Sequence, residues 1–315
     1  MLLEKNDYEH AAAETDMITG HMKELRGVLK HDEPMADHTS WHTGGRADHY
    51  FEPVDLEDLI GYMKSVPADE QLLWVGLGSN LLVRDGGFRG SVIALGRAFN
   101  HLEITAAGQV KVDAGVPCAK VARFSARAGY TGAEFLAGIP GTMGGALAMN
   151  AGAFGGETWN IVSSVKTLSR TGNITTRVPA DFNIGYRSVQ IPSNEWFISA
   201  ALQLQKDHEK TAGQRIRELL EKRSATQPVG LPSCGSVFRN PTGDYAARLI
   251  DACGLKGKRI GDAAISEKHA NFIINHGNAT ARDIEGLVGL AKQKVLEKFG
   301  IELTPEVRIV GVAQD

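Results

Sequence analysis

Hydrophobic side chains recur at the spacing of an amphipathic helix in five segments of the chain. The first segment follows Asp55, a good N-cap residue. The last begins after Thr280, which can form a capping box with Asp283, and ends before Gly300. The pattern therefore predicts helices over residues 55–66, 117–128, 214–224, 245–253 and 281–299.

Short runs rich in β-branched and aromatic residues lie between these helices and predict strands. Turn residues join two pairs of runs, so residues 102–112 and 161–178 are each expected to form a hairpin. Strands and helices do not alternate regularly as they would in a doubly wound sheet, which makes the predicted fold class α+β. The expected strands span residues 72–75, 81–83, 90–95, 102–105, 109–112, 161–168, 173–178, 196–205, 271–275 and 303–310.

A run of very small residues over 137–157 interrupts this pattern. Glycine loses more conformational freedom on folding than any other residue, so such a run indicates positive φ angles or close approach to a ligand. Backbone N–H groups at Gly138, Gly141, Gly144 and Gly145 can form anion-binding nests, and the alanines leave room for a flat ring. The alternative is an Ala/Gly-rich helix that packs tightly on a neighbour.

Another glycine loop, residues 76–80, lies earlier in the chain and directly follows the predicted strand 72–75. It is the first of the two glycine loops in chain order, and the run over 137–157 is the second. The strand followed by Gly-x-Gly suggests a dinucleotide-binding fingerprint, but Leu81 stands where the third glycine is required and no helix follows. Backbone amides with the Ser79 and Asn80 side chains would then bind a phosphate. A plain tight turn remains the alternative.

Changes in composition divide the chain into three parts. Residues 1–36 are polar and predict a loosely attached N-terminal arm. Residues 37–208 contain both glycine loops and predict one ligand-binding domain, and a charged connector separates them from a second domain over 209–315.

The bulk composition is that of an ordinary globular protein: 315 residues, 43% hydrophobic and 23% charged. The net charge of -3 and the absence of a basic run argue against a nucleic-acid partner. No apolar run is long enough to span a bilayer, and residues 1–20 do not resemble a secretory signal, so we expect no membrane insertion. Three widely spaced cysteines favour a reducing cytoplasm.

Few side chains are candidates for chemistry. His38 and His42 lie in a segment that is expected to be extended, so they would not share a helix face, and we expect no metal site. Ser236 follows a glycine in a turn but lacks the flanking glycines of a hydrolase nucleophile elbow, which favours a proton donor. Cys234 is a competing nucleophile. Arg187 and Glu306 are unusual charges, and taken alone each is more often part of a structural ion pair than a catalytic group.

Five motifs stand out along the chain: Val75 to Leu81, Gly138 to Ala153, Tyr186-Arg187, Gly235 to Pro241 and Pro305 to Arg308. In this order and spacing they resemble the UDP-N-acetylenolpyruvoylglucosamine reductase (MurB) family over about residues 37–312. The resemblance implies an FAD-binding domain of the PCMH/vanillyl-alcohol-oxidase type with two α+β lobes, followed by an α+β substrate-binding domain. The short distance between Arg187 and Ser236 along the chain is similar to the compact, type II form, which lacks an inserted loop over the nucleotide sugar.

The resemblance also implies a reaction. Non-covalent FAD would take hydride from NADPH and pass it to the vinyl CH2 carbon of UDP-N-acetylglucosamine enolpyruvate, forming UDP-N-acetylmuramate. Arg187 would stabilise the developing negative charge, Ser236 would donate the proton, and Glu306 would assist as a hydrogen-bonding partner or acid.

The implied binding residues fall into two sets. Those for the cofactor are Gly76, Leu77, Gly78, Ser79, Asn80, Leu81, Gly138, Ile139, Pro140, Gly141, Thr142, Gly145, Asn150, Ala151 and Gly152. Those for the nucleotide-sugar substrate are Tyr186, Arg223, Gln227, Asn240 and His269.

Two other functions fit parts of the pattern. A flavin oxidase of the same fold should lack the Gly-Ser-Val-Phe turn at residues 235–238 and often carries a flavin-linking histidine before its glycine loop. A non-catalytic nucleotide-binding protein could use the same loops. The sequence leaves the oligomeric state, the purpose of residues 1–36 and the contacts of the uridine end open.

Overall fold

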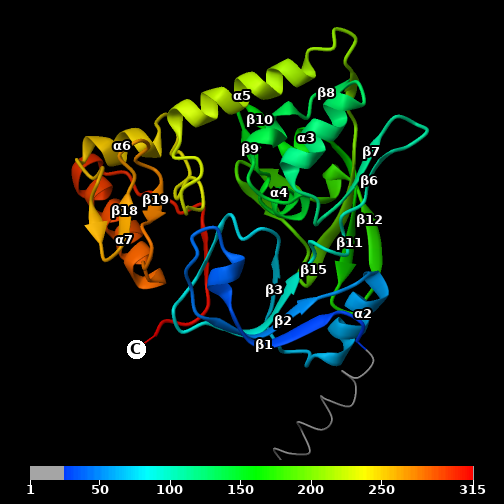
Figure 1. Ribbon diagram of the computed structural model, residues 1–315, viewed down its shortest axis with the longest axis horizontal. Helices are drawn as coiled ribbons and strands as arrows, with labels where there is room; N and C mark the ends of the chain where they lie inside the picture. Colours follow the sequence, from blue (N-terminus) through cyan, green and yellow to red (C-terminus); the bar gives the residue numbers. More distant parts are fainter. Residues whose placement is uncertain (1–24, 315) are drawn as a thin grey trace, which may run out of the picture.

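The structure is a computed structural model that describes residues 25–314. Figure 1 shows a first lobe (blue to cyan) beside a second lobe (green), with a third α+β body (orange) connected through helix α5 (Ala212–Thr226). The predicted α+β class is confirmed. No helix within the described residues is both long and apolar enough to cross a membrane.

The first lobe is built on a mixed four-stranded sheet in the order β1-β2-β5-β3. Strands β1 and β2 pair antiparallel, whereas β5 runs parallel to both β2 and β3. Helix α2 packs its apolar face on this sheet, and the Asp55 side chain caps it by accepting the backbone N–H of Asp58, as predicted. The elements are β1 (Val28–Pro34), the 3-10 helix η1 (Met35–His38), β2 (Arg46–Glu52), α2 (Leu56–Ser65), β3 (Leu72–Val75), β4 (Leu81–Val83) and β5 (Phe88–Ala94).

Strand β1 corrects the expected N-terminal arm. Residues 28–34 were expected to be loosely attached, but they pair along β2 from Val28 with Glu52 to Pro34 with Arg46. Neither face of β1 is deeply buried, so it lacks the alternating pattern that reveals a strand in a sequence. Residues 1–24 of the predicted arm lie outside the described residues.

The second lobe contains an antiparallel sheet in the order β12-β11-β15-β7-β6, and both predicted hairpins are confirmed within it. Helices α3 and α4 share its apolar core with the sheet. Its main elements are β6 (Leu102–Ile104), β7 (Val110–Asp113), α3 (Cys118–Arg127), α4 (Met143–Met149), β11 (Val162–Ser169), β12 (Ile174–Arg177) and β15 (Glu195–Leu202). Short elements connect them: β8 (Tyr130–Thr131), η2 (Glu134–Gly138), β9 (Gly152–Ala153), β10 (Gly156–Glu157), η3 (Thr158–Ile161), η4 (Pro179–Asp181), β13 (Asn183–Gly185), β14 (Ser188–Gln190) and β16 (Gln205–Lys206).

The third body packs two helices against a small antiparallel sheet in the order β17-β18-β19. The predicted capping box of Thr280 and Asp283 begins α7, and Gly300 ends it in the left-handed conformation. The elements are α6 (Ala246–Ala252), β17 (Arg259–Ile260), β18 (Ala263–Ile265), β19 (Ile273–Asn275), α7 (Ala281–Phe299) and β20 (Arg308–Val310).

Strand pairing and a buried tryptophan help to join the third body to the first lobe. Strand β20 pairs parallel with β4 of the first lobe. Trp41 is fully buried in the core of the third body, where its Nε1–H donates to the carbonyl of Ile273 at 2.8 Å. Helix α5 in turn packs on α3 and η2 of the second lobe. The division into 37–208 and 209–315 stays a prediction, since segments of each part complete the other.

Candidate active site

The first glycine loop, residues 76–80, connects β3 to β4 and packs against His38 and Thr39. Gly78 has a φ of +59°, and a Cβ there would overlap the carbonyl oxygen of His38 and lie 2.7 Å from Cα of Thr39. Only glycine combines this left-handed backbone with so close an approach. The loop conformation is therefore determined by residue type as well as by packing.

The second glycine run contains a short helix, α4, rather than an entirely irregular loop. Two backbone bonds hold its first turn: the N–H of Met143 donates to Val116 and that of Gly144 to Ala114. The expectation that the Gly144 N–H is free for an anion is therefore wrong. A Cβ at Gly141 would lie 3.2 Å from Oγ of Ser79, so small residues are what leave space between the two loops.

Both loops line one cleft of about 740 Å³, a volume ordinary for a cofactor or nucleotide site. Every residue that the sequence predicted as a cofactor contact lines it except Asn150. The predicted catalytic residues Arg187, Ser236 and Glu306 line the same cleft. Three segments far apart in the sequence are thus brought to one cavity together with the loops.

Asn150 instead holds the protein's own backbone together. It is 1% exposed, has a φ of +48° and donates through Nδ2 to Glu157 Oε2 at 3.0 Å and to the carbonyl of Gly185 at 3.1 Å. Its Oδ1 accepts the backbone N–H of Trp159 at 3.1 Å. Asn150 therefore ties the second glycine run to the hairpin of β13 and β14, whose turn carries Arg187.

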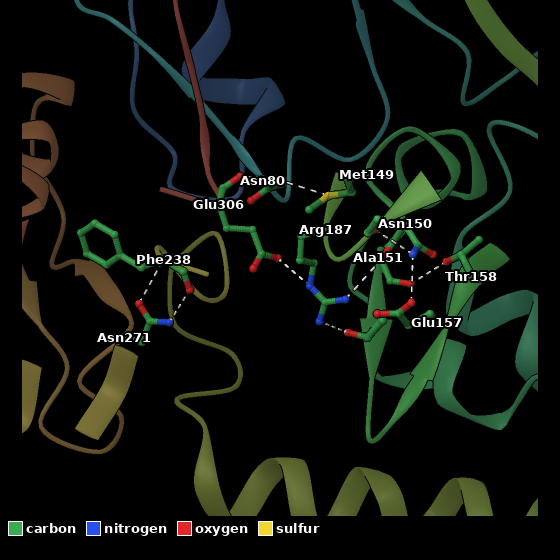
Figure 2. A network of polar contacts seen from close by, with 12 residues as sticks. Asn80, Met149, Asn150, Ala151, Glu157, Thr158, Arg187, Phe238, Asn271 and Glu306 are labelled. Atoms are coloured by element: carbon green, nitrogen blue, oxygen red, sulfur yellow. Dashed lines mark hydrogen bonds and ion pairs between the residues drawn. The ribbon is translucent and has the colours of Figure 1, made fainter. Parts of the chain in front are cut away.

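Arg187 and Glu306 form an ion pair inside the cleft, with 3.2 Å between Nε and Oε1 (Figure 2). The same guanidinium donates to the carbonyl of Gly152 at 2.6 Å and to that of Asn150 at 3.4 Å, so its orientation is fixed by the glycine run. Burial raises the pKa of the Glu306 carboxyl, although the Arg187 and Arg239 guanidinium groups act in the opposite direction. The raised pKa favours a carboxyl that can hold a proton.

Ser236 lies in a turn between α5 and α6, directly after Gly235, which has a φ of +72°. The next residue, Val237, accepts the backbone N–H of Glu306 at 2.7 Å through its carbonyl oxygen. One backbone hydrogen bond therefore connects the segment that carries the hydroxyl to the segment that carries the carboxyl. After this turn the chain forms an isolated β-bridge between Phe238 and Pro305.

Four of the five predicted substrate contacts line the cleft: Tyr186, Arg223, Gln227 and Asn240. The Arg223 Nε donates to Gln227 Oε1 at 3.1 Å, and burial lowers the pKa of its guanidinium. His269 does not line the cleft. Its Nδ1 accepts the backbone N–H of Asn271 at 3.3 Å, and its ring packs edge-on against Phe272.

Comparison with known proteins identifies the family. Residues 227–310 match the model of the UDP-N-acetylenolpyruvoylglucosamine reductase C-terminal domain, and residues 47–177 match an FAD binding domain. The chain is 53% identical over 289 residues to the UDP-N-acetylenolpyruvoylglucosamine reductase of Methylococcus capsulatus, covering 92% of this chain and 95% of that protein. The Legionella pneumophila (strain Corby) reductase is 52% identical over 300 residues, covering 95% and 97%. The chain belongs to the UDP-N-acetylenolpyruvoylglucosamine reductase family.

A solved structure of the family has the same fold. The UDP-N-acetylenolpyruvylglucosamine reductase (MurB) from Thermus caldophilus aligns with a TM-score of 0.78 at 33% identity, over 90% of this chain and 98% of that one. The resemblance read from the five motifs is therefore confirmed, and so is the expected FAD-binding domain. The space between the two glycine loops fits such a cofactor, since small residues line it where larger side chains would fill it.

Three further residues line the cleft but were given no role in the sequence analysis. Asn271, Phe238 and Arg239 also line the cleft, and the Arg239 Nε is buried without a hydrogen-bond partner among the described residues. Asn271 left one local signal, a polar residue inside the apolar run from Ala270 to Ile274. Phe238 and Arg239 lie inside the Gly235 to Pro241 motif, although the sequence analysis assigned neither of them a role.

The alternative nucleophile, Cys234, loses its basis. The Cys234 thiol is 3% exposed and donates to the carbonyls of Gly78 and Leu81, and burial raises its pKa to about 12, so it is not a nucleophile at neutral pH. His38 faces Glu33 at 2.9 Å and stacks on Tyr50. Within residues 25–314 no cluster of three or more metal-ligating side chains occurs.

Proposed function

We propose that the chain reduces UDP-N-acetylglucosamine enolpyruvate to UDP-N-acetylmuramate, with non-covalently bound FAD as hydride carrier and NADPH as the electron donor. As a member of its family it is a flavoprotein oxidoreductase of peptidoglycan precursor synthesis. The observation that carries the proposal is that the Arg187–Glu306 pair and the Ser236 turn line the same cleft as the two glycine loops. The reaction would take place in the cytoplasm.

The loops at 76–81 and 138–152 hold the cofactor in this proposal. FAD would supply hydride transfer, a chemistry that no amino-acid side chain offers. The protein's contribution is the cavity and the orientation of the substrate's vinyl group toward the ring.

Arg187 stabilises the charge that develops when the vinyl CH2 carbon of the substrate receives hydride. The electron pair of the double bond then moves to the adjacent carbon and into the substrate carboxylate. A guanidinium that two backbone carbonyls already hold in place needs no reorganisation at that moment. Such preorganised electrostatics is worth about 3 kcal/mol per donor.

Ser236 donates the proton that completes the reaction at the carbon next to the ether oxygen. Its partial exposure lets it recover a proton from solvent afterwards. Glu306 acts beside it as a hydrogen-bonding partner or acid, which agrees in direction with its raised pKa. Tyr186, Arg223, Gln227 and Asn240 would contact the diphosphate and sugar of the substrate.

Anaerobic rapid mixing separates the two halves of this reaction. NADPH should bleach the yellow protein, and the enolpyruvate substrate should then restore the colour without oxygen. Ser236→Ala should leave bleaching intact and slow the recovery of colour about 100-fold or more. A colourless protein that cannot take up FAD would refute the proposal, and reoxidation only by oxygen would favour a flavin oxidase.

A further inference from the structure

The position of the Ser236 hydroxyl depends on the backbone that carries it. Ser236 follows Gly235 in the left-handed region, a conformation that does not restrict the neighbouring peptides by itself. Other contacts must hold the peptide groups after Ser236 if its hydroxyl is to donate a proton to one particular carbon atom of the substrate.

Asn271 supplies that restraint through three hydrogen bonds. Its Oδ1 accepts the backbone N–H of Phe238 at 2.9 Å, and its Nδ2 donates to the carbonyl of the same residue at 2.8 Å. Its own carbonyl accepts the N–H of Val237 at 2.9 Å. Figure 2 shows the amide facing both polar groups of Phe238. Because one side chain holds the donor and the acceptor of a single residue, both of its peptide planes are fixed.

The restraint extends to the carboxyl. Val237 is bonded on one side to Asn271 and on the other to the backbone N–H of Glu306. Asn271 is 3% exposed and lines the cleft next to the Ser236 turn, whereas His269, two residues earlier in the chain, does not. A shift of the turn would therefore displace the hydroxyl and the carboxyl together.

We propose that Asn271 is a positioning residue for proton transfer from Ser236. The proposal rests on the role assigned to Ser236 above. The bland alternative is that Asn271 only stabilises the third body, as buried asparagines often do. The two differ in which half of the reaction a substitution affects.

Asn275 provides a matched control. It too is 3% exposed, and its side-chain amide makes three hydrogen bonds, to the carbonyl of Trp41 and the N–H groups of Gly277 and Ala279. The side-chain amide of Asn271 makes two, and none of the three bonds of Asn275 reaches residues 235–238. Asn275→Ala should therefore lower the urea midpoint of unfolding at least as much as Asn271→Ala.

Asn271→Ala should retain FAD and be bleached by NADPH within about twofold of the wild-type rate, whereas substrate-dependent reoxidation should fall about 10- to 100-fold, the usual cost of a 1 Å misplacement. Asn275→Ala should reoxidise at close to the wild-type rate. Asn271→Asp keeps the volume and the acceptor but turns a second oxygen toward the carbonyl of Phe238 in place of the donor, so its reoxidation should be well below wild type. It is also the second variant if the alanine variant fails to fold. Equal reoxidation by Asn271→Asp and wild type would overturn the proposal.

A double substitution separates the proposal from its premise. If Asn271 acts through the hydroxyl, Asn271→Ala should slow reoxidation by less than about threefold when Ser236 is already alanine, because coupled sites are not additive. An equal loss in both backgrounds would show that Asn271 acts elsewhere. If Ser236→Ala alone reoxidises normally, it is the role of Ser236 that fails.

Discussion

Replacing Gly78 with alanine should weaken FAD binding at least tenfold. The residue has a φ of +59°, and a left-handed conformation costs an alanine about 1 to 2 kcal/mol. The added Cβ would in addition lie 2.7 Å from Cα of Thr39, where ordinary contact begins at 3.4 Å. The added Cβ would meet this Cα and the carbonyl oxygen of His38. Both atoms belong to the backbone, so the loop has to shift by several tenths of an ångström.

That shift moves the neighbouring loop residues Ser79 and Asn80, which line the cleft. Asn80 donates through Nδ2 to the carbonyl of Glu306 at 3.1 Å, so the segment that carries Glu306 moves with the loop. A loss of 1.4 kcal/mol in binding is a tenfold change in the dissociation constant. The loss or lengthening of one hydrogen bond between the loop and FAD costs about this much free energy, which is enough for a tenfold weaker affinity.

Gly254→Ala is the matched control for Gly78→Ala. Gly254 has a φ of +69° with no atom within 4 Å of the added Cβ, so it should lose about 1 to 2 kcal/mol of stability and no FAD affinity. Affinity is measured by titrating apoprotein with FAD and following flavin fluorescence, and stability by urea unfolding of the same samples. FAD binding by Gly78→Ala that equals the control's would contradict the assignment of this loop to the cofactor.

Three further changes test other parts of the molecule. The Arg177 guanidinium lowers the pKa of Glu195, so the stability this pair adds is present above about pH 4.5 and lost as pH falls; Glu195→Gln should flatten the acid limb of the stability profile in urea titrations. Trp41→Phe removes the donor to the buried carbonyl of Ile273 and should cost about 1 to 3 kcal/mol, read from the urea midpoint. Cys234 should react with iodoacetamide only as the protein unfolds, which mass spectrometry of timed samples would detect, and rapid labelling of the folded state would contradict its burial.

The sequence determined much of the local structure. Helix α7 begins and ends where Thr280, Asp283 and Gly300 predict, because capping requires only neighbours in the chain. The hairpins in the second lobe follow for the same reason, since their turns are encoded by the residues within them. The two glycine loops were singled out from the sequence because backbone that must adopt rare φ angles or approach a ligand requires glycine, and both line the cleft.

Only the tertiary structure decided which residues act together. Asn150 was predicted to bind the cofactor, yet its amide is bonded to Glu157, Gly185 and Trp159. Asn271 was not singled out at all. The side-chain amides of Asn150 and Asn271 bind partners far along the chain or backbone groups. Every residue has a backbone carbonyl and nearly every residue has an N–H, so the sequence does not reveal which of these groups a buried amide will bind. The meeting of Arg187 with Glu306 in one cleft is likewise a product of the pairing of β20 with β4, which no local pattern encodes.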